Sequence, residues 1–375
     1  MSRSAVPSVL AIAPSTLRPR PLSSVVAAAI ALATLAGAAA PTIAQPGFYH
    51  VLDLGAVPAS SVCPCFQAMS LSDAGHAAGL YFAPDGTRRA FLYNQSMADI
   101  GTLGGIAQAF GVNDAGVVVG YSVDPQGRQR AIRQHQGVIA DLGTLQNGIH
   151  ANANGVNNQG WIVGMSQRKF GTELWQRAAL WQGGTVTDLG TFGGEYAEAE
   201  AVNDAGQVVG WAWDAQRRQR AFLWTAAGGL RDLGTLPGGV SSGASDVSDL
   251  GVVVGFSVQG DGSYQGFRWT EQGGMAALPA PAGAVNATPA AVNDGGNAVG
   301  SAFNPIQCST VPVLWHQGRP VNLNTVLAPG SGWTVIAAND INSRGEIAAS
   351  ARFGGGPYRA IVLIPASDVS RDAAR

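Results

Sequence analysis

Short runs of apolar or alternating residues, separated by polar segments, follow one another along most of the chain. A representative pair is EAEAVN at 198–203 and QVVGWAW at 207–213, with Asn203, Asp204 and Gly206 in the polar segment that joins them. Two short runs joined in this way are typical of a tight β-hairpin. We expect Asn203 or Asp204 to hydrogen-bond the turn backbone and Gly206 to adopt a positive φ.

The same hairpin phrase occurs seven times, so the chain is built from repeats. Its copies include VNDAGVVVG at 112–120 and VSDLGVVVG at 247–255. The turn glycines of the seven copies are Gly75, Gly116, Gly160, Gly206, Gly251, Gly296 and Gly345. They recur every 41 to 49 residues, a period that indicates a repeat architecture.

Two further phrases complete each repeat. One is RAFLW at 220–224, and its aromatic and aliphatic residues predict a strand. The other is DLGTLPGG at 232–239, which follows after a short turn that contains glycine. Each repeat therefore holds two hairpins, or four short strands, and very little sequence that could form a helix.

Seven repeats of four strands predict an all-β, seven-bladed β-propeller. Along the strand at 220–224, Phe222 and Trp224 point to one face while Ala221 and Leu223 point to the other, so both faces are apolar. A sheet covered on both faces fits a blade between two neighbouring blades. The alternative is a β-solenoid, whose coils are usually shorter and carry fewer hairpin turns.

The two ends of the repeat region predict how the ring closes. FYHVLDLG at 48–55 is the last phrase of a repeat, whereas RAIVLIP at 359–365 is the phrase that normally precedes it. We expect the N-terminal strand to complete the blade formed by the C-terminal strands, which leaves no exposed terminal faces. The interpretation is one repeat domain over 48–365 and a polar tail over 366–375.

Residues 1–44 have a different composition and predict a cleaved secretory signal. Arg18 and Arg20 precede the apolar run VVAAAIALATLA at 25–36, and small residues follow it. This run is too short to span a bilayer. We expect a secreted or periplasmic protein with no membrane span after cleavage; a buried N-terminal helix is the alternative.

Composition and charge exclude several classes of function. The chain has 375 residues, is 46% hydrophobic and 12% charged, and contains 51 glycines, as expected for a turn-rich globular protein. The formal net charge is −2 and the charges are scattered, so no stripe for nucleic-acid phosphates is predicted. Neither a Walker loop nor an HExxH pair occurs, and the turns offer too few oxygen ligands for calcium. We expect a monomer without a cofactor.

The recurring phrases resemble those of a known family. DLGTLGG, a spacer, VNDAGQVVG and then an RAFLY-like phrase are similar to the HAF repeat family of extracellular bacterial proteins, over residues 48 to about 365. One departure is that arginine replaces the family's histidine before Ala-Phe. The resemblance implies an exported repeat protein, and it supplies no mechanism because the family carries no established activity.

Five arginines occupy one repeat position and are candidate binding residues. A ring of these side chains would attract a carboxylated or sulfated ligand. The alternative is that each arginine pairs with a strand-end aspartate such as Asp232. The five residues are Arg89, Arg130, Arg177, Arg220 and Arg359.

Glu198 and Glu200 are the candidate catalytic residues. They alternate with alanines and therefore share one face of a strand. Paired carboxyl groups perform acid/base work in glycoside hydrolysis. A solvated edge or a local salt bridge is the alternative interpretation.

Cys63, Cys65 and His76 form a candidate soft-metal site, because they lie within one short segment. The alternatives are a strained disulfide between Cys63 and Cys65, and free or intermolecularly paired thiols. Cys308 lies in a distant repeat.

Three tryptophans lie outside the repeating positions and are candidate markers of a carbohydrate-binding or protein-binding face. They are Trp161, Trp175 and Trp333. Other tryptophans, such as Trp224, recur at one repeat position and are interpreted as blade packing. The functional hypothesis is a binding scaffold for an extracellular glycan or protein; the alternative is an enzyme acting on extracellular polysaccharide.

Overall fold

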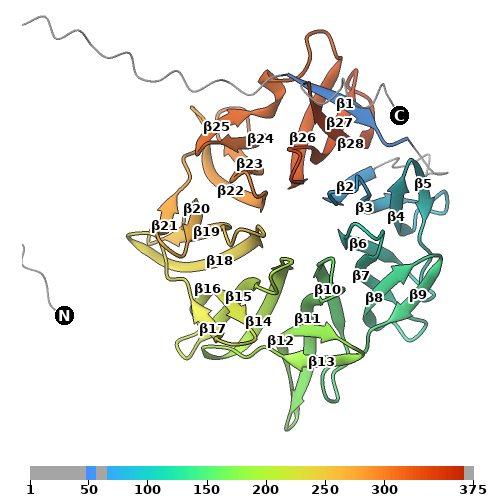
Figure 1. Cartoon of the computed structure of the whole chain (residues 1–375), viewed down its shortest axis with the longest axis vertical. Coiled ribbons are helices and arrows are strands. Elements are labelled where there is room, and N and C mark those ends of the chain that lie inside the picture. The colour runs from blue at the N-terminus through green and yellow to red at the C-terminus, as the bar shows by residue number, and fades with distance from the viewer. Residues whose placement is uncertain (1–47, 56–65, 367–375) are drawn as a thin grey trace, which may run out of the picture. The chain divides into compact units, whose positions relative to one another are not determined.

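The computed structural model describes residues 48–55 and 66–366, and this part of the chain forms seven antiparallel sheets of four strands each. The sheets are arranged in a ring around a central axis (Figure 1). The chain is therefore a seven-bladed β-propeller, as the repeat pattern predicts, and the β-solenoid alternative is wrong. The predicted signal over 1–44, Cys63, Cys65 and all but the first residue of the predicted tail lie outside the described residues.

Each blade is a simple meander, numbered here from its inner strand outward. Blades 1 to 3 contain β2 (Phe66–Leu71), β3 (Ala77–Phe82), β4 (Arg88–Asn94) and β5 (Ser96–Asp99); β6 (Ala107–Val112), β7 (Val118–Val123), β8 (Gln129–His135) and β9 (Val138–Asp141); and β10 (Ala151–Val156), β11 (Ile162–Phe170), β12 (Glu173–Gln182) and β13 (Thr185–Asp188). Blades 4 and 5 contain β14 (Gly193–Val202), β15 (Val208–Asp214), β16 (Gln219–Thr225) and β17 (Gly229–Asp232); and β18 (Gly239–Val247), β19 (Val253–Gln259), β20 (Tyr264–Thr270) and β21 (Gly274–Ala277).

The last two blades differ in how they are assembled. Blade 6 contains β22 (Val285–Val292), β23 (Ala298–Asn304), β24 (Ser309–His316) and β25 (Arg319–Asn322), followed by a short 3-10 helix, η1 (Leu323–Thr325). Blade 7 contains β26 (Trp333–Ile341), β27 (Ile347–Phe353), β28 (Tyr358–Pro365) and, as its outer strand, β1 (Tyr49–Asp53). β1 pairs antiparallel with β28 from Tyr49 opposite Pro365 to Asp53 opposite Ile361. The predicted closure by the N-terminal strand is confirmed.

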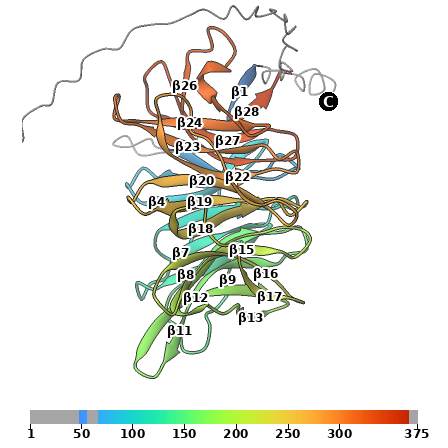
Figure 2. The same cartoon turned by 90° about the vertical axis from the view of Figure 1, so that its left-hand side faces the viewer.

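The hydrophobic core lies between the blades. Figure 2 shows neighbouring sheets lying against one another, and each apolar cluster draws side chains from two of them. Between blades 4 and 5, for example, Leu223 packs with Phe267 and Trp269. Phe222 and Ala221, on opposite faces of β16, are both fully buried. Burial on both faces explains why the strand phrases are continuously apolar.

The repeated tryptophan packs between blades, as interpreted from the sequence. Trp181 and Trp315 are buried, and each donates its indole N–H to a carbonyl of the preceding blade: Nε1 of Trp181 to Gly143 at 3.2 Å, and Nε1 of Trp315 to Pro279 at 2.7 Å. The described residues include no helix long and apolar enough to cross a bilayer.

Candidate functional site in the axial channel

The seven inner strands surround an axial channel, and each of them ends in the repeated polar turn. All seven turns therefore lie at one end of the channel, which we call the turn mouth. The opposite end, where the inner strands begin, we call the wide mouth. Three connected cavities of about 180, 220 and 780 Å³ lie along the channel from the turn mouth to the wide mouth.

At the turn mouth, the first polar residue of each phrase closes its own turn and also holds the next blade. Oδ1 of Asn203 accepts the N–H of Gln207 at 2.8 Å, and Nδ2 of the same amide donates to the carbonyl of Ser248 in blade 5 at 2.8 Å. Gly206 has φ 74°, as predicted. The same two-sided role is taken by Asn113, Asn157, Asn203, Asn293 and Asn342. Serine stands at the remaining two positions, Ser72 and Ser248, and has no amide to donate.

The second polar residue of the phrase forms another inter-blade ring. Asp204 donates its backbone N–H to Oδ1 of Asp249 at 2.7 Å, and Oδ1 of Asp204 accepts the N–H of Asn158 at 2.8 Å. The carboxylates of this ring therefore serve as acceptors for the neighbouring turn. We call these two sets of contacts the turn ring.

In the described part of the chain, no cluster of three or more His, Cys, Asp or Glu residues is placed to hold a metal ion.

Halfway along the channel, each inner strand contains a β-bulge whose extra residue lines the cavity. In blade 4 the bulge falls between Ala199 and Ala201, so Glu200 is the extra residue. Gly210 of β15 lies opposite, and a Cβ there would come within 2.1 Å of the Glu198 carbonyl. The glycine of the VVG phrase therefore permits the close approach of the bulged strand. The seven bulge residues are Met69, Phe110, Asn154, Glu200, Ser245, Ala290 and Asn339.

Two buried carboxyl groups follow the bulges in blades 5 and 7. Oδ2 of Asp246 accepts the N–H of Val292, and Oδ2 of Asp340 accepts the N–H of Leu71, each at 2.8 Å across a blade boundary. Burial, followed by the charge of Asp340, raises the pKa of Asp246 to about 7. Burial likewise raises the pKa of Asp340. The middle of the channel therefore favours protonated acids.

The largest cavity opens at the wide mouth and contains both candidate glutamates. Glu198 accepts hydrogen bonds from three amides: Asn154 at 2.9 Å and Asn152 at 3.3 Å on Oε1, and Gln176 at 3.0 Å on Oε2. Glu200 accepts from Nε1 of Trp211 at 3.1 Å and from Asn154 at 3.4 Å. Asn154 thus bridges the two carboxyl groups. The expectation that both share one face is met, but they form no salt bridge among the described residues.

The environment of this cavity disfavours the ionised form of Glu200. Burial is the main cause and the negative charge of Glu198 the second cause of a rise in the pKa of Glu200 to about 8. Glu200 is therefore mostly protonated at neutral pH. None of the residues that line the cavity is lysine, arginine or histidine.

Four aromatic side chains also line this cavity. Phe256 and Tyr264 lie with ring centroids 5.6 Å apart, and Tyr264 is 46% exposed at the entrance. Phe110 and Trp211 line the cavity deeper in. Trp211, Tyr264 and the amides Asn152 and Asn154 were not among the candidates that the sequence provided. For Asn154 the available signal was the bulge position, where the residue type changes from one repeat to the next although the flanking residues recur.

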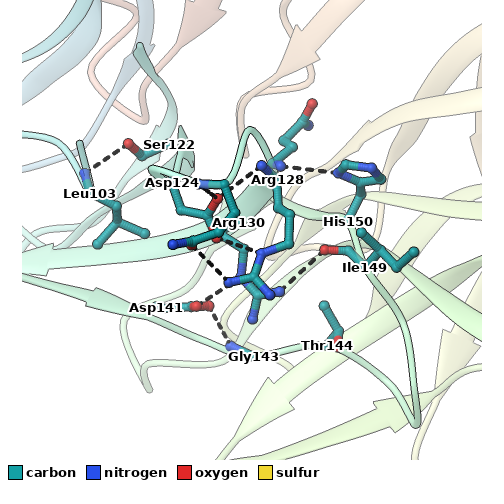
Figure 3. Close-up of polar contacts among 12 residues, drawn as sticks. Leu103, Ser122, Asp124, Arg128, Arg130, Asp141, Gly143, Thr144, Ile149 and His150 are labelled. Atoms are coloured by element: carbon teal, nitrogen blue, oxygen red, sulfur yellow. Dashed lines mark hydrogen bonds and ion pairs between the residues drawn. The ribbon is translucent and has the colours of Figure 1, made fainter. Parts of the chain in front are cut away.

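The five repeated arginines are all paired. Arg130 donates from Nε to Oδ2 of Asp141 at 2.8 Å and from Nη1 to the carbonyl of Ile149 at 3.2 Å, and Oδ1 of Asp141 accepts the N–H of Gly143 (Figure 3). This geometry explains the Asp-Leu-Gly phrase, because one carboxylate holds both the arginine and the glycine. The equivalent pairs are Arg89 with Asp99 at 3.8 Å, Arg177 with Asp188 and Arg220 with Asp232 at 3.0 Å each, and Arg359 with Asp53.

The three candidate tryptophans lie at different ends of the molecule. Trp161 is half-buried at the turn mouth, where its ring covers Gly206 of the next blade. Trp175 and Trp333 lie at the wide-mouth ends of their strands, against Phe170 and Phe353, with ring centroids 4.4 and 5.2 Å apart. None of the three lines the large cavity.

His76, the described member of the candidate soft-metal site, is half-buried, with Nδ1 3.4 Å from the Asn113 carbonyl.

Comparison with solved structures agrees with the architecture. No family model and no curated protein matches the chain. Similar solved structures include a puromycin hydrolase (13% identity, 86% of this chain, TM-score 0.55), a prolyl endopeptidase (11%, 81%, 0.51) and TolB from Acinetobacter baumannii (10%, 77%, 0.46). The chain covers 55%, 50% and 63% of those proteins, respectively. At these identities the likeness extends to the fold alone: the chain is a seven-bladed β-propeller.

Proposed function

We propose that this chain is an exported binding protein of the HAF repeat family that holds part of a carbohydrate in the large cavity at the wide mouth. The recurring phrases and the apolar run at 25–36 support the family and export. The observation that carries binding is the composition of the cavity wall, which combines aromatic rings with amides and carboxyl groups. Aromatic faces stack on the apolar faces of sugar rings while the polar groups orient the hydroxyls.

The asymmetry of the cavity supports this proposal over a purely structural role. A hydrogen bond that is needed to hold the ring together recurs in most repeats, as it does in the turn ring. The cluster of Glu198, Asn154 and Trp211 is instead confined to blades 3 and 4. Residues that differ from blade to blade around a cavity of about 780 Å³ indicate a site shaped for a ligand.

A glycan array probed with the purified protein tests the proposal, and three variants locate the site. Trp211→Ala and Tyr264→Ala remove cavity walls, whereas Trp175→Ala removes an aromatic ring on the same side of the molecule but outside the cavity. We expect the first two variants to lose binding and Trp175→Ala to retain it. Loss only in Trp175→Ala would move the site to the outer loops, and the absence of any glycan binding would overturn the proposal.

A second candidate function is hydrolysis of the bound carbohydrate. The observation that favours it is a protonated Glu200 beside Glu198, the combination of acid and carboxylate that glycosidases use. Against it, both groups lie on one strand and therefore on one wall of the cavity, and three amides hold Glu198. Products that appear on mass spectrometry and vanish in Glu198→Gln would establish an enzyme.

A further inference from the structure

The large cavity combines carboxyl groups with a lack of basic side chains. Glu198 and Glu200 line it, Asp246 and Asp340 line the neighbouring cavity deeper in the channel, and no lysine, arginine or histidine lines either one. The repeated arginines do not supply the missing charge, because each pairs with its own aspartate at the outer edge of a blade. The cavity is therefore an environment that favours a positive charge.

Both glutamates retain hydrogen-bonding capacity toward the cavity. A carboxylate has about four lone-pair positions. Glu200 accepts two hydrogen bonds, of which the one from Asn154 is long at 3.4 Å, and Oε2 of Glu198 accepts only the hydrogen bond from Gln176. An ammonium group has three N–H donors and no acceptor, so it matches what these two carboxyl groups lack.

The aromatic wall adds a second attraction for a cation. Nε1 of Trp211 bonds Glu200, which fixes the indole beside the carboxyl pair, and Phe256 and Tyr264 line the same cavity. The faces of aromatic rings attract ammonium groups, and tryptophan does so most strongly. Hydroxyl groups of Thr288, Ser301 and Thr310 also line the cavity and match a polyhydroxylated ligand.

We propose that the ligand of the large cavity is an amino sugar with an unsubstituted amine, and that Glu198 and Glu200 are the counter-ions of its ammonium group. This inference rests on the proposed function, because it names the class of sugar that the same cavity takes. An acetyl group on that nitrogen removes the charge and places an amide between the two carboxyl groups.

Binding of such a ligand is coupled to release of a proton. In the free protein, burial and Glu198 keep Glu200 protonated at neutral pH. An ammonium group between the two side chains favours the ionised form and lowers the pKa of Glu200. The groups that face Glu200 from β10 and β15, Asn154 and Trp211, carry no charge, and the acids deeper in the channel oppose ionisation. The proton therefore leaves Glu200 when the ligand enters.

Isothermal titration calorimetry with three probes tests this inference. The probes are a glucosamine oligosaccharide with free amines, its fully N-acetylated counterpart, and spermidine, which has amines but no sugar ring. We expect the free-amine sugar to bind at least about tenfold more tightly than the acetylated one, the effect of one charge-assisted hydrogen bond. Titrations in buffers of different ionisation enthalpy, at about pH 6 so that the sugar amine enters as an ammonium ion, should reveal release of a proton. Spermidine binding as tightly as the amino sugar would overturn the assignment to a sugar.

Glutamine variants identify the counter-ions. Glu198→Gln and Glu200→Gln should each reduce the preference for the free amine, and Glu200→Gln should also abolish proton release. Glu271→Gln is the matched control, because Glu271 is exposed and pairs with Arg231 far from the cavity. Proton release by the unmodified protein tests the inference even if a variant folds poorly.

Failure of this inference is distinguishable from failure of the proposed function. Equal affinity for the free-amine and acetylated sugars, unchanged in both glutamine variants, would overturn the amino-sugar assignment and leave carbohydrate binding intact. If no saccharide binds, both the proposed function and this inference fall.

Discussion

The turn at the end of each inner strand and the bulge that precedes it carry different kinds of sequence. At the turn mouth the same two polar residues recur in blade after blade and bond the next blade in the same direction around the ring. At the bulge, which in blade 4 lies three residues before Asn203, the seven blades present methionine, phenylalanine, asparagine, glutamate, serine and alanine. The turn is constrained by the ring, whereas the bulge residue varies.

This difference indicates how a repeat protein can acquire a binding site without losing its fold. The turn ring is nearly regular, because five of the seven blades donate an amide to the next blade and only Ser72 and Ser248 lack one. The bulge residues line the channel, and of the seven only Asn154 bonds its equivalent in the next blade, Glu200. Asn154 and Asn339 also donate to a carbonyl of the next blade, at Ala199 and Ala68. The other bulge side chains can change without loss of such contacts. Polar groups of the turn ring are therefore expected to matter for stability, and polar groups of the large cavity for binding.

The largest expected effect comes from breaking the turn ring at one blade. Asn203 is only 4% exposed and bonds both its own turn and Ser248. Asn203→Ala should lower the free energy of unfolding by about 2–4 kcal/mol, because it leaves buried partners unsatisfied. Tyr264→Ala, at the entrance of the large cavity, should change it by less than about 1 kcal/mol. Urea unfolding of both variants measures the contrast, and equal losses would contradict it.

A second prediction concerns how the stability of the folded protein depends on pH. Glu200 has an ordinary pKa of 4.5 in the unfolded chain and about 8 in the folded protein, so the folded protein binds more protons between these values. The contribution of Glu200 to the free energy of unfolding is therefore fully present below about pH 4.5, and it is lost as the pH rises through 8. Asp246, with a pKa of about 7, acts in the same direction.

Glu200→Gln should remove part of this dependence. We expect the variant to be more stable than the unmodified protein at pH 9, by on the order of 2 kcal/mol, and similar to it at pH 5. Urea midpoints at both pH values provide the measurement. A variant with an unchanged slope between pH 5 and 9 would show that Glu200 does not carry the proton.

A third prediction concerns a substitution that adds an amide to the turn ring at a blade that lacks one. Ser72 and Ser248 occupy positions at which asparagine elsewhere donates to the next blade. Ser248→Asn should add the missing hydrogen bond to blade 6 and stabilise the protein by about 0.5–1.5 kcal/mol. Ser242→Asn, at a buried serine that already donates to Gly234, is the control and should destabilise. A fall in the melting temperature of Ser248→Asn would contradict a ring built on repeated amides.

The smallest expected effect belongs to the arginine pairs at the outer edge. Arg220 and Asp232 are partly exposed, with side chains 19% and 38% accessible, so a double-mutant cycle should give a coupling of about 0.2–1 kcal/mol. Arg177 and Asp188 are less exposed, at 10% and 11%, and should couple more strongly. Coupling that is weaker in the buried pair than in the exposed one would contradict this ranking.

The fold was predictable because the features that define it recur. Gly206, Asn203 and Phe222 each have equivalents in most repeats, and a pattern repeated seven times identifies strands, turns and closure. The large cavity depends on residues that do not recur, such as Trp211 and Asn154, and on bulges that shift the register within a strand. Glu198 and Glu200 were identifiable as neighbours on one face, but the burial that raises the pKa of Glu200 is a property of the assembled ring.

The pairing of β1 with β28 also bears on how the polypeptide folds. Tyr49 is opposite Pro365, so the last blade is assembled from segments at the two ends of the repeat domain. Blades 1 to 6 contain only sequence-local strand pairings, and each can pack on the preceding blade as the chain leaves the ribosome. β1 has no partner until β28 has been made. Loop closure over nearly the whole domain is therefore the late step, and conditions that slow it expose an unpaired strand edge to other molecules.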